Sequence, residues 1–475
     1  MLNVRKTKIL CTLGPVSEDP EVIRKLVEAG MNAVRLNTSH GSLQEHRRNI
    51  RMIKSIREEL SVSLPIVLDL EGPKIRVEGL ENPIHVDQGE EIYLFKERKD
   101  GIRKGFRTSY PKLVEELEIG DRILVDDGKI GFEVVNKREN FLILRAENSG
   151  EVKPRKGVNV PGVDISLPAL SEKDRDFIAL AVEEKVEFVA QSFVRKPSDV
   201  LELKKLIVEL KGSQEIIAKI ETAQALENLE DIVKNADAVM VARGDLGVEI
   251  PTEMVPIEQK RIIQLANRYT KPVITATQML ESMIDSPVPT RAEATDIANS
   301  ILDGTDVMML SGETAVGKYP IEAVKVMDKI AREVEKRFED FRGYQIGWLR
   351  EFPVVSDRSE AIAHSCWDIS ETLNLNLIVT PTATGGTAKR VSKYRPRAVI
   401  IGIASDESTF HKLGLVWGVV PLLMRKTVST DKMFDDISEL LLEKNIAEKG
   451  ETIVITAGIP WGISGTTNLI KIHTL

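Results

Sequence analysis

Short apolar runs rich in β-branched residues alternate with longer amphipathic stretches over most of the chain. Most runs precede a stretch whose apolar positions have helical spacing, such as 19–29, which Gly30 closes, and 256–269. Alternating strand and helix signals predict a parallel sheet, and eight such units predict a closed TIM (β/α)8 barrel. The eight runs are residues 7–13, 32–38, 64–70, 187–193, 215–221, 237–243, 272–278 and 305–311.

The interval between the third and fourth runs has a different pattern. Its apolar segments 84–95, 122–136 and 141–147 alternate as in strands, with turn signals at 87–89 and 127–128. Prolines and glycines mark its return to the barrel. The pattern predicts a small β domain, residues 73–166, inserted after the third barrel strand.

A second α/β pattern follows the eighth unit. Strand-like runs 375–380, 398–404, 419–424 and 451–457 accompany helical stretches such as 359–373, and the chain ends in an apolar run. We therefore expect a barrel formed by residues 1–72 and 167–339, the inserted domain, and a C-terminal α/β domain over residues 340–475.

Composition narrows the class of protein. Of 475 residues, 42% are hydrophobic, which is enough for a sizeable core. The net charge of −8 argues against a nucleic-acid partner. Cys11 and Cys366 alone make no disulfide framework, so a reducing cytoplasm fits. The charged N-terminus and the lack of any run near the roughly 20 apolar residues of a membrane span predict no membrane association.

Polar residues cluster where the predicted barrel strands end. A lone Lys-x-Glu on a strand is more often a surface pair than a site, but packing does not explain polar residues at nearly every strand end. Barrel enzymes carry their chemistry at this face. The strand-end groups are Arg35, Asn37, Ser39, His40, Asp69, Ser192, Lys219, Glu221, Arg243, Gly244, Asp245, Thr275, Thr277, Ser311 and Glu313.

The period of a strand indicates what these residues can do. Lys219 and Glu221 are two apart and share a face. If that face meets the barrel mouth, Glu221 and Asp245 can converge on one Mg²⁺ or Mn²⁺, which prefer a few carboxylates plus substrate oxygens. Arg35 suits phosphate, Lys219 supplies a compact cation, and the glycine turn at Gly244 can bind an anion. Positioning and charge stabilisation are what phosphoryl transfer requires.

Six motifs occur in family order and together resemble pyruvate kinase: residues 33–41, 218–221, 239–247, 276–283, 289–293 and 310–315. The resemblance implies a barrel with an inserted small β-barrel lid and a C-terminal regulatory domain, assembled as a homotetramer. It implies transfer of the phosphoryl group of phosphoenolpyruvate to ADP, giving pyruvate and ATP through a metal-stabilised enolate, the last step of glycolysis.

The resemblance also implies roles for single residues. Glu221 and Asp245 would ligate Mg²⁺ or Mn²⁺, and Lys219 would stabilise the phosphoryl group in transit while Arg35 grips phosphate. Gly244, Asp245 and Thr277 would hold the substrate carboxylate. Thr277 and Ser311 would belong to the network that protonates the enolate. The positions expected near the nucleotide are Arg76, His40, Lys156 and Asp127.

The C-terminal domain carries a loop of hydroxyls and glycines between a strand and a helix. Its position resembles the effector-phosphate loop of the family, with a companion loop at 461–465. Relatives that respond to fructose bisphosphate often carry Lys or Arg in the first loop, whereas this chain has Ala383. The loop therefore predicts either a phosphorylated effector of unidentified kind or an ordinary helix cap. The candidate residues are Thr382, Thr384, Gly385, Gly386 and Thr387.

The chain departs from the family after the third strand. The resemblance places a K⁺ site among Asn37, Ser39, Asp69 and the carbonyl of Leu70. The family stretch resembles Asp-Thr-Lys-Gly-Pro-Glu-Ile-Arg, but here Lys74 replaces the acid and Glu71 the base. An ammonium close to that site would repel K⁺ and would itself supply the positive charge that K⁺ provides. We therefore expect that K⁺ is not required. Alternatively, Glu71 and Lys74 only preserve a surface pair.

Two other functions share parts of this pattern. Another metal-dependent barrel enzyme that handles phosphoenolpyruvate or pyruvate enolates, such as an aldolase or lyase, would need neither Arg35 nor the lid. An inactive regulatory paralogue would lose site residues by drift, yet Arg35, Lys219, Glu221, Asp245 and Thr277 are all intact.

Overall fold

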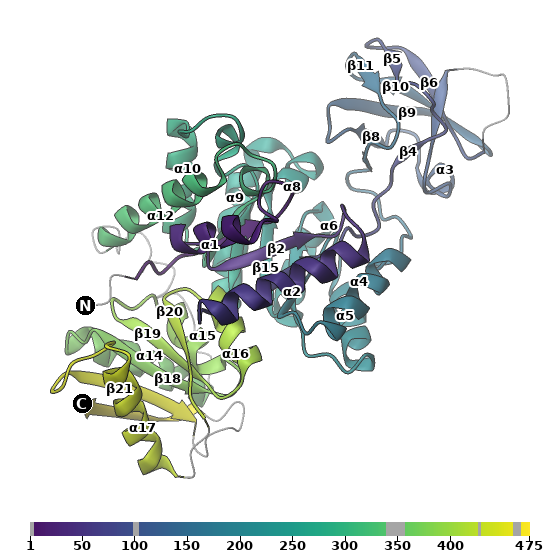
Figure 1. Cartoon of the computed structure of the whole chain (residues 1–475). Coiled ribbons are helices and arrows are strands. Elements are labelled where there is room, and N and C mark those ends of the chain that lie inside the picture. Colours follow the sequence, from purple (N-terminus) through teal and green to yellow (C-terminus); the bar gives the residue numbers. More distant parts are fainter. Residues whose placement is uncertain (1–3, 98–103, 339–356, 426–428, 459–466) are drawn as a thin grey trace.

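The computed structural model describes residues 4–97, 104–338, 357–425, 429–458 and 467–475. A central barrel lies between a small β domain and a C-terminal α/β domain (Figure 1). The barrel is closed, with strand order β1-β17-β16-β15-β14-β13-β3-β2, and all neighbouring strands are parallel, which confirms the predicted fold. Its strands are β1 (Lys8–Thr12), β2 (Ala33–Asn37), β3 (Ile66–Asp69), β13 (Phe188–Gln191), β14 (Glu215–Ile220), β15 (Ala238–Ala242), β16 (Val273–Ala276) and β17 (Val307–Leu310).

The barrel helices begin and end where capping chemistry predicts. In α1 (Pro20–Ala29), the Asp19 side chain accepts from the backbone of the first turn, and Gly30 ends the helix at φ 119°. Ile23 and Leu26 form its buried face. The other elements around the barrel are α2 (Leu43–Glu59), α4 (Glu172–Glu183), α5 (Pro197–Glu209), α6 (Ala223–Glu227), α7 (Leu229–Asn235), α8 (Arg243–Glu249), η1 (Thr252–Met254), α9 (Val255–Arg268), η2 (Glu281–Ile284), α10 (Arg291–Leu302), α11 (Gly312–Ala315) and α12 (Pro320–Lys336).

The inserted domain follows β3 and has its own apolar core. It contains a seven-stranded sheet and a two-stranded sheet. The strand order is β12-β8-β9-β10-β6-β7-β4 in the first, and the second pairs β11 with β5. The predicted turns at 87–89 and 127–128 separate β5 from β6 and β8 from β9. Its elements are β4 (Val77–Glu78), β5 (Ile84–Val86), β6 (Glu91–Phe95), β7 (Gly105–Thr108), α3 (Leu113–Glu116), β8 (Arg122–Val125), β9 (Ile130–Arg138), β10 (Phe141–Ala146), β11 (Gly150–Val152) and β12 (Val158–Asn159).

The C-terminal domain is a five-stranded sheet in the order β20-β19-β18-β21-β22, in which only β22 runs antiparallel. The apolar run at the end of the chain is thus an edge strand. The limits proposed between the domains stay predictions, and residue 340 lies outside the described residues. The elements are α14 (Arg358–Thr372), β18 (Leu377–Thr382), α15 (Gly386–Lys393), β19 (Val399–Ala404), α16 (Glu407–Lys412), η3 (Leu413–Leu415), β20 (Val419–Leu423), α17 (Thr430–Glu443), β21 (Thr452–Gly458) and β22 (Thr467–Thr474).

Polar contacts attach the C-terminal domain to the barrel. Arg395 forms a buried ion pair with Asp306, with 2.8 Å between Nη1 and Oδ1. His411 is buried, and the backbone N–H of Leu64 donates to its Nδ1 at 3.4 Å. Burial, reinforced by the positive charge of Arg57, lowers the pKa of His411 to about 3, so this imidazole is neutral at neutral pH. Within the described ranges, none of the helices combines the length and apolar character that a bilayer span requires.

Candidate active site

The alternation of side chains along the barrel strands directs the charged residues. In β14, Ile217 packs inside the barrel, whereas Ala218 packs between the barrel and its helices. Lys219 has the same parity as Ile217, so it points into the barrel at its carboxyl end. The same rule orients Arg35 and Asp69, which lie two residues beyond interior positions of β2 and β3.

A chain of alternating charges crosses the barrel mouth. Arg35 Nε donates to Asp69 Oδ2 at 2.6 Å. The ammonium of Lys219 lies 3.4 Å from Asp69 Oδ1 and 2.7 Å from Glu221 Oε1, and it donates to Ser192 Oγ at 2.7 Å. Asp69, Lys219 and Glu221 are buried. Strand-end residues of β2, β3, β13 and β14 therefore meet at the barrel mouth.

The electrostatics of this chain favour the charged forms of Lys219 and Asp69 but oppose ionisation of Glu221. Burial disfavours the charge of Lys219, but Asp69, Glu221 and Asp245 outweigh it and hold the pKa of Lys219 above its ordinary value. Burial also opposes ionisation of Asp69, but Lys219 and Arg35 hold the pKa of that carboxyl below its usual range. Burial raises the pKa of Glu221, and repulsion from Asp245 adds to this, although Lys219 acts against it.

Glu221 and Asp245 are the two carboxylates that could hold a divalent cation. Asp245 lies in the first turn of α8, and its charge acts on both Lys219 and Glu221. Oε1 of Glu221 is buried and has no hydrogen-bond donor of good geometry among the described residues, although Oε2 accepts from the Phe193 N–H at 2.8 Å. In the described ranges no group of three or more His, Cys, Asp or Glu could bind a metal. A pair of carboxylates fits Mg²⁺ or Mn²⁺ that takes its other ligands from substrate and water.

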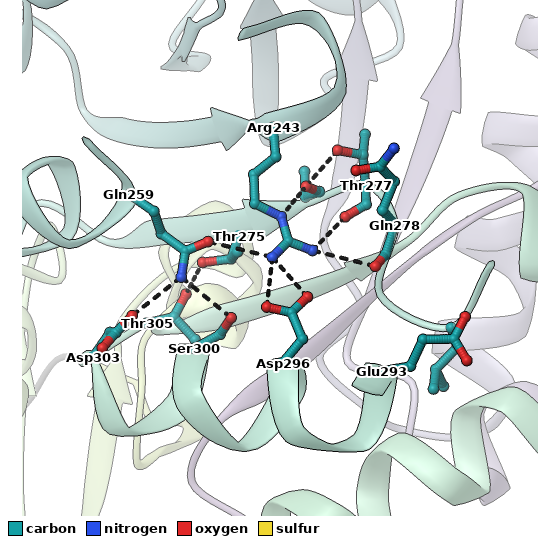
Figure 2. Close-up of polar contacts among 12 residues, drawn as sticks. Arg243, Gln259, Thr275, Thr277, Gln278, Glu293, Asp296, Ser300, Asp303 and Thr305 are labelled. Atoms are coloured by element: carbon teal, nitrogen blue, oxygen red, sulfur yellow. Dashed lines mark hydrogen bonds and ion pairs between the residues drawn. The ribbon is translucent and has the colours of Figure 1, made fainter. Parts of the chain in front are cut away.

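Thr277 and Gly244 lie in contact at the ends of β16 and β15. The Gly244 N–H donates to Thr277 Oγ1 at 2.9 Å, and a Cβ at Gly244 would lie 3.5 Å from that oxygen. Arg243 binds the backbone carbonyls next to Thr277, while Asp296 binds the guanidinium from α10 (Figure 2). Ser311 follows β17, and its buried hydroxyl has no hydrogen-bond partner among the described residues.

The four residues expected near the nucleotide divide into two groups. Arg76 directly precedes β4 and Lys156 lies between β11 and β12, where Arg76 bridges to Gly157. The charge of Asp127, in the lid turn, acts on Lys156. In the part of the chain that the structure describes, no hydrogen bond or ion pair joins His40 to these three side chains; its carbonyl accepts from His46 on α2.

Lys74 lies on the barrel-to-lid connection. A Cβ at Gly157 would lie 3.1 Å from its Cε and 3.8 Å from its Nζ, so the side chain packs against the returning connection. Glu71 pairs instead with Arg76 and Lys173. Among the described residues Lys74 forms no ion pair, so the alternative of a Glu71–Lys74 surface pair is wrong.

The candidate effector loop leads from β18 into α15. Thr382 Oγ1 accepts from the Gly385 N–H at 3.0 Å, and Gly385 has φ 82°, a conformation that favours glycine. Thr387 Oγ1 lies 2.8 Å from the hydroxyl of Thr467. The companion loop at 461–465 lies outside the described residues.

The sequence pattern did not predict the contacts of two residues near these sites, Ser192 and Arg390. Ser192 was recognised only as a strand-end residue, yet it bonds Lys219 and Leu70. A Cβ at Gly386 would lie 3.2 Å from Nη1 of Arg390, so α15 supplies the basic group that the loop lacks. The i, i+4 spacing on the helix was the signal that could have revealed it.

Comparisons with known proteins match nearly the whole chain. A family model described as "Pyruvate kinase, barrel domain" matches residues 4–324, and "Pyruvate kinase, alpha/beta domain" matches residues 360–473. The chain is 45% identical to a pyruvate kinase of Thermotoga maritima, over 99% of each chain. It is 43% identical to a pyruvate kinase of Staphylococcus aureus, over 99% of this chain and 80% of that one. A crystal structure of a pyruvate kinase from Cryptosporidium parvum superimposes with a TM-score of 0.93 at 35% identity, covering 99% of this chain and 96% of that one.

Proposed function

Because the chain belongs to the pyruvate kinase family and is a phosphotransferase that converts phosphoenolpyruvate and ADP into pyruvate and ATP, we propose that Lys219, Glu221 and Asp245 form the centre of transfer. The observation that carries this assignment is the buried chain of Arg35, Asp69, Lys219 and Glu221 across the barrel mouth, with Asp245 beside it.

Arg35 and Lys219 face the phosphoryl group. Nε and Nη1 of Arg35 are held by Asp69 and Thr12, at 2.6 and 3.0 Å, which fixes the plane of the guanidinium. Among the described residues Nη2 has no partner, so it is available to a phosphate oxygen. The ammonium of Lys219 lies between two carboxylates and stabilises charge on the group in transit.

Glu221 and Asp245 hold Mg²⁺ or Mn²⁺. When bound, the metal supplies Lewis-acid stabilisation of phosphate and enolate charge. The Gly244 and Asp245 backbone groups and the Thr277 hydroxyl orient the substrate carboxylate. Thr277 and Ser311 then belong to the network that delivers a proton to the enolate carbon; the unpartnered Ser311 hydroxyl supports this role.

The lid completes the site for the nucleotide. Arg76, Lys156 and Asp127 lie on the lid and its connections, and His40 lies on the barrel. Closure would bring the two groups together around ADP and exclude water, which suppresses hydrolysis. An ADP titration of Arg76→Gln tests this assignment: we expect a raised KM for ADP and an unchanged KM for phosphoenolpyruvate.

We propose that this enzyme does not require K⁺. Asp69 already has two cationic partners, Arg35 and Lys219, and the Leu70 carbonyl accepts from Ser192. Lys74 adds a positive charge to the same connection. Turnover in K⁺-free buffer with a bulky organic counter-ion should equal turnover with K⁺, whereas Lys74→Glu should create a K⁺ requirement. Strong K⁺ activation of the unmodified enzyme would contradict the proposal.

The remaining assignments concern regulation and assembly. A phosphorylated effector would bind at residues 382–387. The first backbone N–H groups of α15 lie there, and Arg390 approaches Gly386. We further propose a cytoplasmic homotetramer. Light scattering should then give four times the 52.9 kDa chain mass.

A coupled assay tests the function as a whole. Pyruvate should form from phosphoenolpyruvate only when ADP and a divalent metal are both present. Release of pyruvate without ADP, or condensation of pyruvate with an aldehyde, would point to a lyase or aldolase instead. Inactivity under all conditions would indicate a regulatory paralogue.

A further inference from the structure

The loop after β16 has a strained backbone. Thr277 and Gln278 both lie in the left-handed region, at φ 66° and 56°. This conformation is unfavourable for residues with a Cβ, and especially for a β-branched one such as Thr277. Two successive strained residues persist only where surrounding contacts hold them.

Arg243 provides those contacts. Its Nη2 donates to the carbonyls of Thr277 and Gln278 at 2.6 and 3.4 Å, and its Nε donates to the carbonyl of Ala276 at 3.3 Å (Figure 2). One guanidinium therefore binds three consecutive carbonyls of the loop. The Thr277 hydroxyl donates to the Ala276 carbonyl at 2.6 Å, so Arg243 and the hydroxyl share this acceptor.

The guanidinium is itself fixed from two helices. Nη1 lies 2.8 and 2.7 Å from the two carboxylate oxygens of Asp296 on α10, and 3.4 Å from Gln259 Oε1 on α9. Gln259 is held in turn by Asp303 at 3.1 Å. The Arg243 side chain is only 10% exposed. A planar guanidinium can donate to a carboxylate on one side and to a row of carbonyls on the other. A lysine ammonium cannot make both sets of contacts.

We propose that Arg243 is a positioning residue for the reaction. Anchored by Asp296, it holds the loop in the conformation that places the Thr277 hydroxyl against the Gly244 N–H, beside the proposed position of the substrate carboxylate. The inference rests on the proposed role of Thr277. The inference gives α10 an indirect function in catalysis: Asp296 on this helix acts on the substrate through Arg243 and the loop.

The experiment compares Arg243→Lys, Asp296→Asn and Thr277→Ala in the full-length enzyme at saturating Mg²⁺. Misplacement of a positioning group by about 1 Å costs on the order of a hundredfold in rate. We expect kcat to fall about tenfold to a hundredfold in the first two variants, with a smaller change in KM for phosphoenolpyruvate. Asp296→Glu, which restores the charge, should recover most of the loss.

Hydrogen exchange gives a readout independent of turnover. The peptide over residues 276–280 should exchange faster in Arg243→Lys and Asp296→Asn, while β14 stays protected. The matched controls are Arg261→Lys and Asp285→Asn. These exposed side chains pair with Glu258 and Lys318 and form no hydrogen bond or ion pair with Arg243 or residues 276–280 among the described residues, so both variants should behave as the unmodified enzyme.

The outcomes separate the inference from the proposed function. If Thr277→Ala loses activity while Arg243→Lys and Asp296→Asn stay within twofold of normal kcat, the inference is wrong and the role of Thr277 stands. If Thr277→Ala is fully active, the role of Thr277 is wrong and the inference falls with it. A fall in kcat without faster exchange at 276–280 also overturns it. Where Arg243→Lys folds poorly, Asp296→Asn decides.

Discussion

Replacing Lys219 with methionine removes the central cation of the site while keeping an unbranched side chain of similar length. Its ammonium lies 2.7 Å from Glu221 and 3.4 Å from Asp69. Loss of one preorganised charge at a phosphoryl-transfer site costs about two to four orders of magnitude in rate, or about 3 to 5 kcal/mol of transition-state stabilisation. We therefore expect kcat for pyruvate formation to fall by about 10²- to 10⁴-fold.

The same change leaves two buried carboxylates with less compensation. Removing one partner of a buried ion pair typically costs about 3 to 5 kcal/mol of stability. Asp69 keeps Arg35, whereas Glu221 keeps the Phe193 N–H but loses its cationic partner and faces the like charge of Asp245. A bound divalent cation offsets that repulsion, so the variant should be more stabilised by Mg²⁺ in thermal unfolding than the unmodified enzyme. The kinetics of Lys219→Met and of the unmodified enzyme should therefore be compared at saturating metal concentration.

Two assays separate transfer from proton delivery. Pyruvate formation is followed with lactate dehydrogenase, and enolisation by deuterium incorporation into the methyl group of added pyruvate. Lys219→Met should lose the first activity and largely keep the second, because Thr277 and Ser311 are unchanged. Lys205→Met, which removes an exposed ammonium paired with Glu209, is the control. Near-normal kinase turnover in Lys219→Met would refute the assigned role.

Further predictions concern the metal, the effector and pH. Glu221→Gln and Asp245→Asn should each raise the Mg²⁺ concentration for half-maximal activity by about tenfold or more; an unchanged dependence would exclude that residue as a ligand. Thr384→Ala combined with Gly386→Glu should abolish activation by any phosphorylated effector and keep basal turnover; loss of basal turnover would mean that the loop is structural. The folded-state pKa of His411 is depressed from 6.5 to about 3, so its contribution to stability is present above pH 6.5 and is lost as pH falls toward 3. The slope is at most about 1.4 kcal/mol per pH unit, since one proton is taken up on unfolding. Urea titrations at several pH values should show that the free energy of unfolding depends less steeply on pH in His411→Asn than in the unmodified enzyme. An equal pH dependence would contradict this.

Much of the fold follows from local patterns. All eight predicted barrel runs contain an observed strand, because a buried parallel strand needs a short apolar run whatever its neighbours are. The period of two along a strand was enough to direct Lys219 into the barrel once Ile217 faced inward. The cap at Asp19 and the stop at Gly30 were equally local, since both depend on backbone groups within one helical turn.

Contacts outside regular elements could not be predicted in the same way. After a strand ends, the direction of a side chain depends on loop geometry and on distant partners, so the sequence pattern did not show that Lys74 packs against Gly157 or that Glu71 binds Arg76. Arg390 approaches the effector loop only because α15 begins directly after it.

The amino-acid sequence by itself determined the barrel, the inserted and C-terminal domains and the set of strand-end residues that we propose for the chemistry, because strand length, apolar period and caps are local properties. Only the tertiary structure decided which of these residues meet. Closure of the barrel brings Asp69 to Lys219, and the packing of α9 and α10 against the barrel brings Gln259 and Asp296 to Arg243. Polar contacts of this kind join separate elements, and their partners are set by how the whole chain packs.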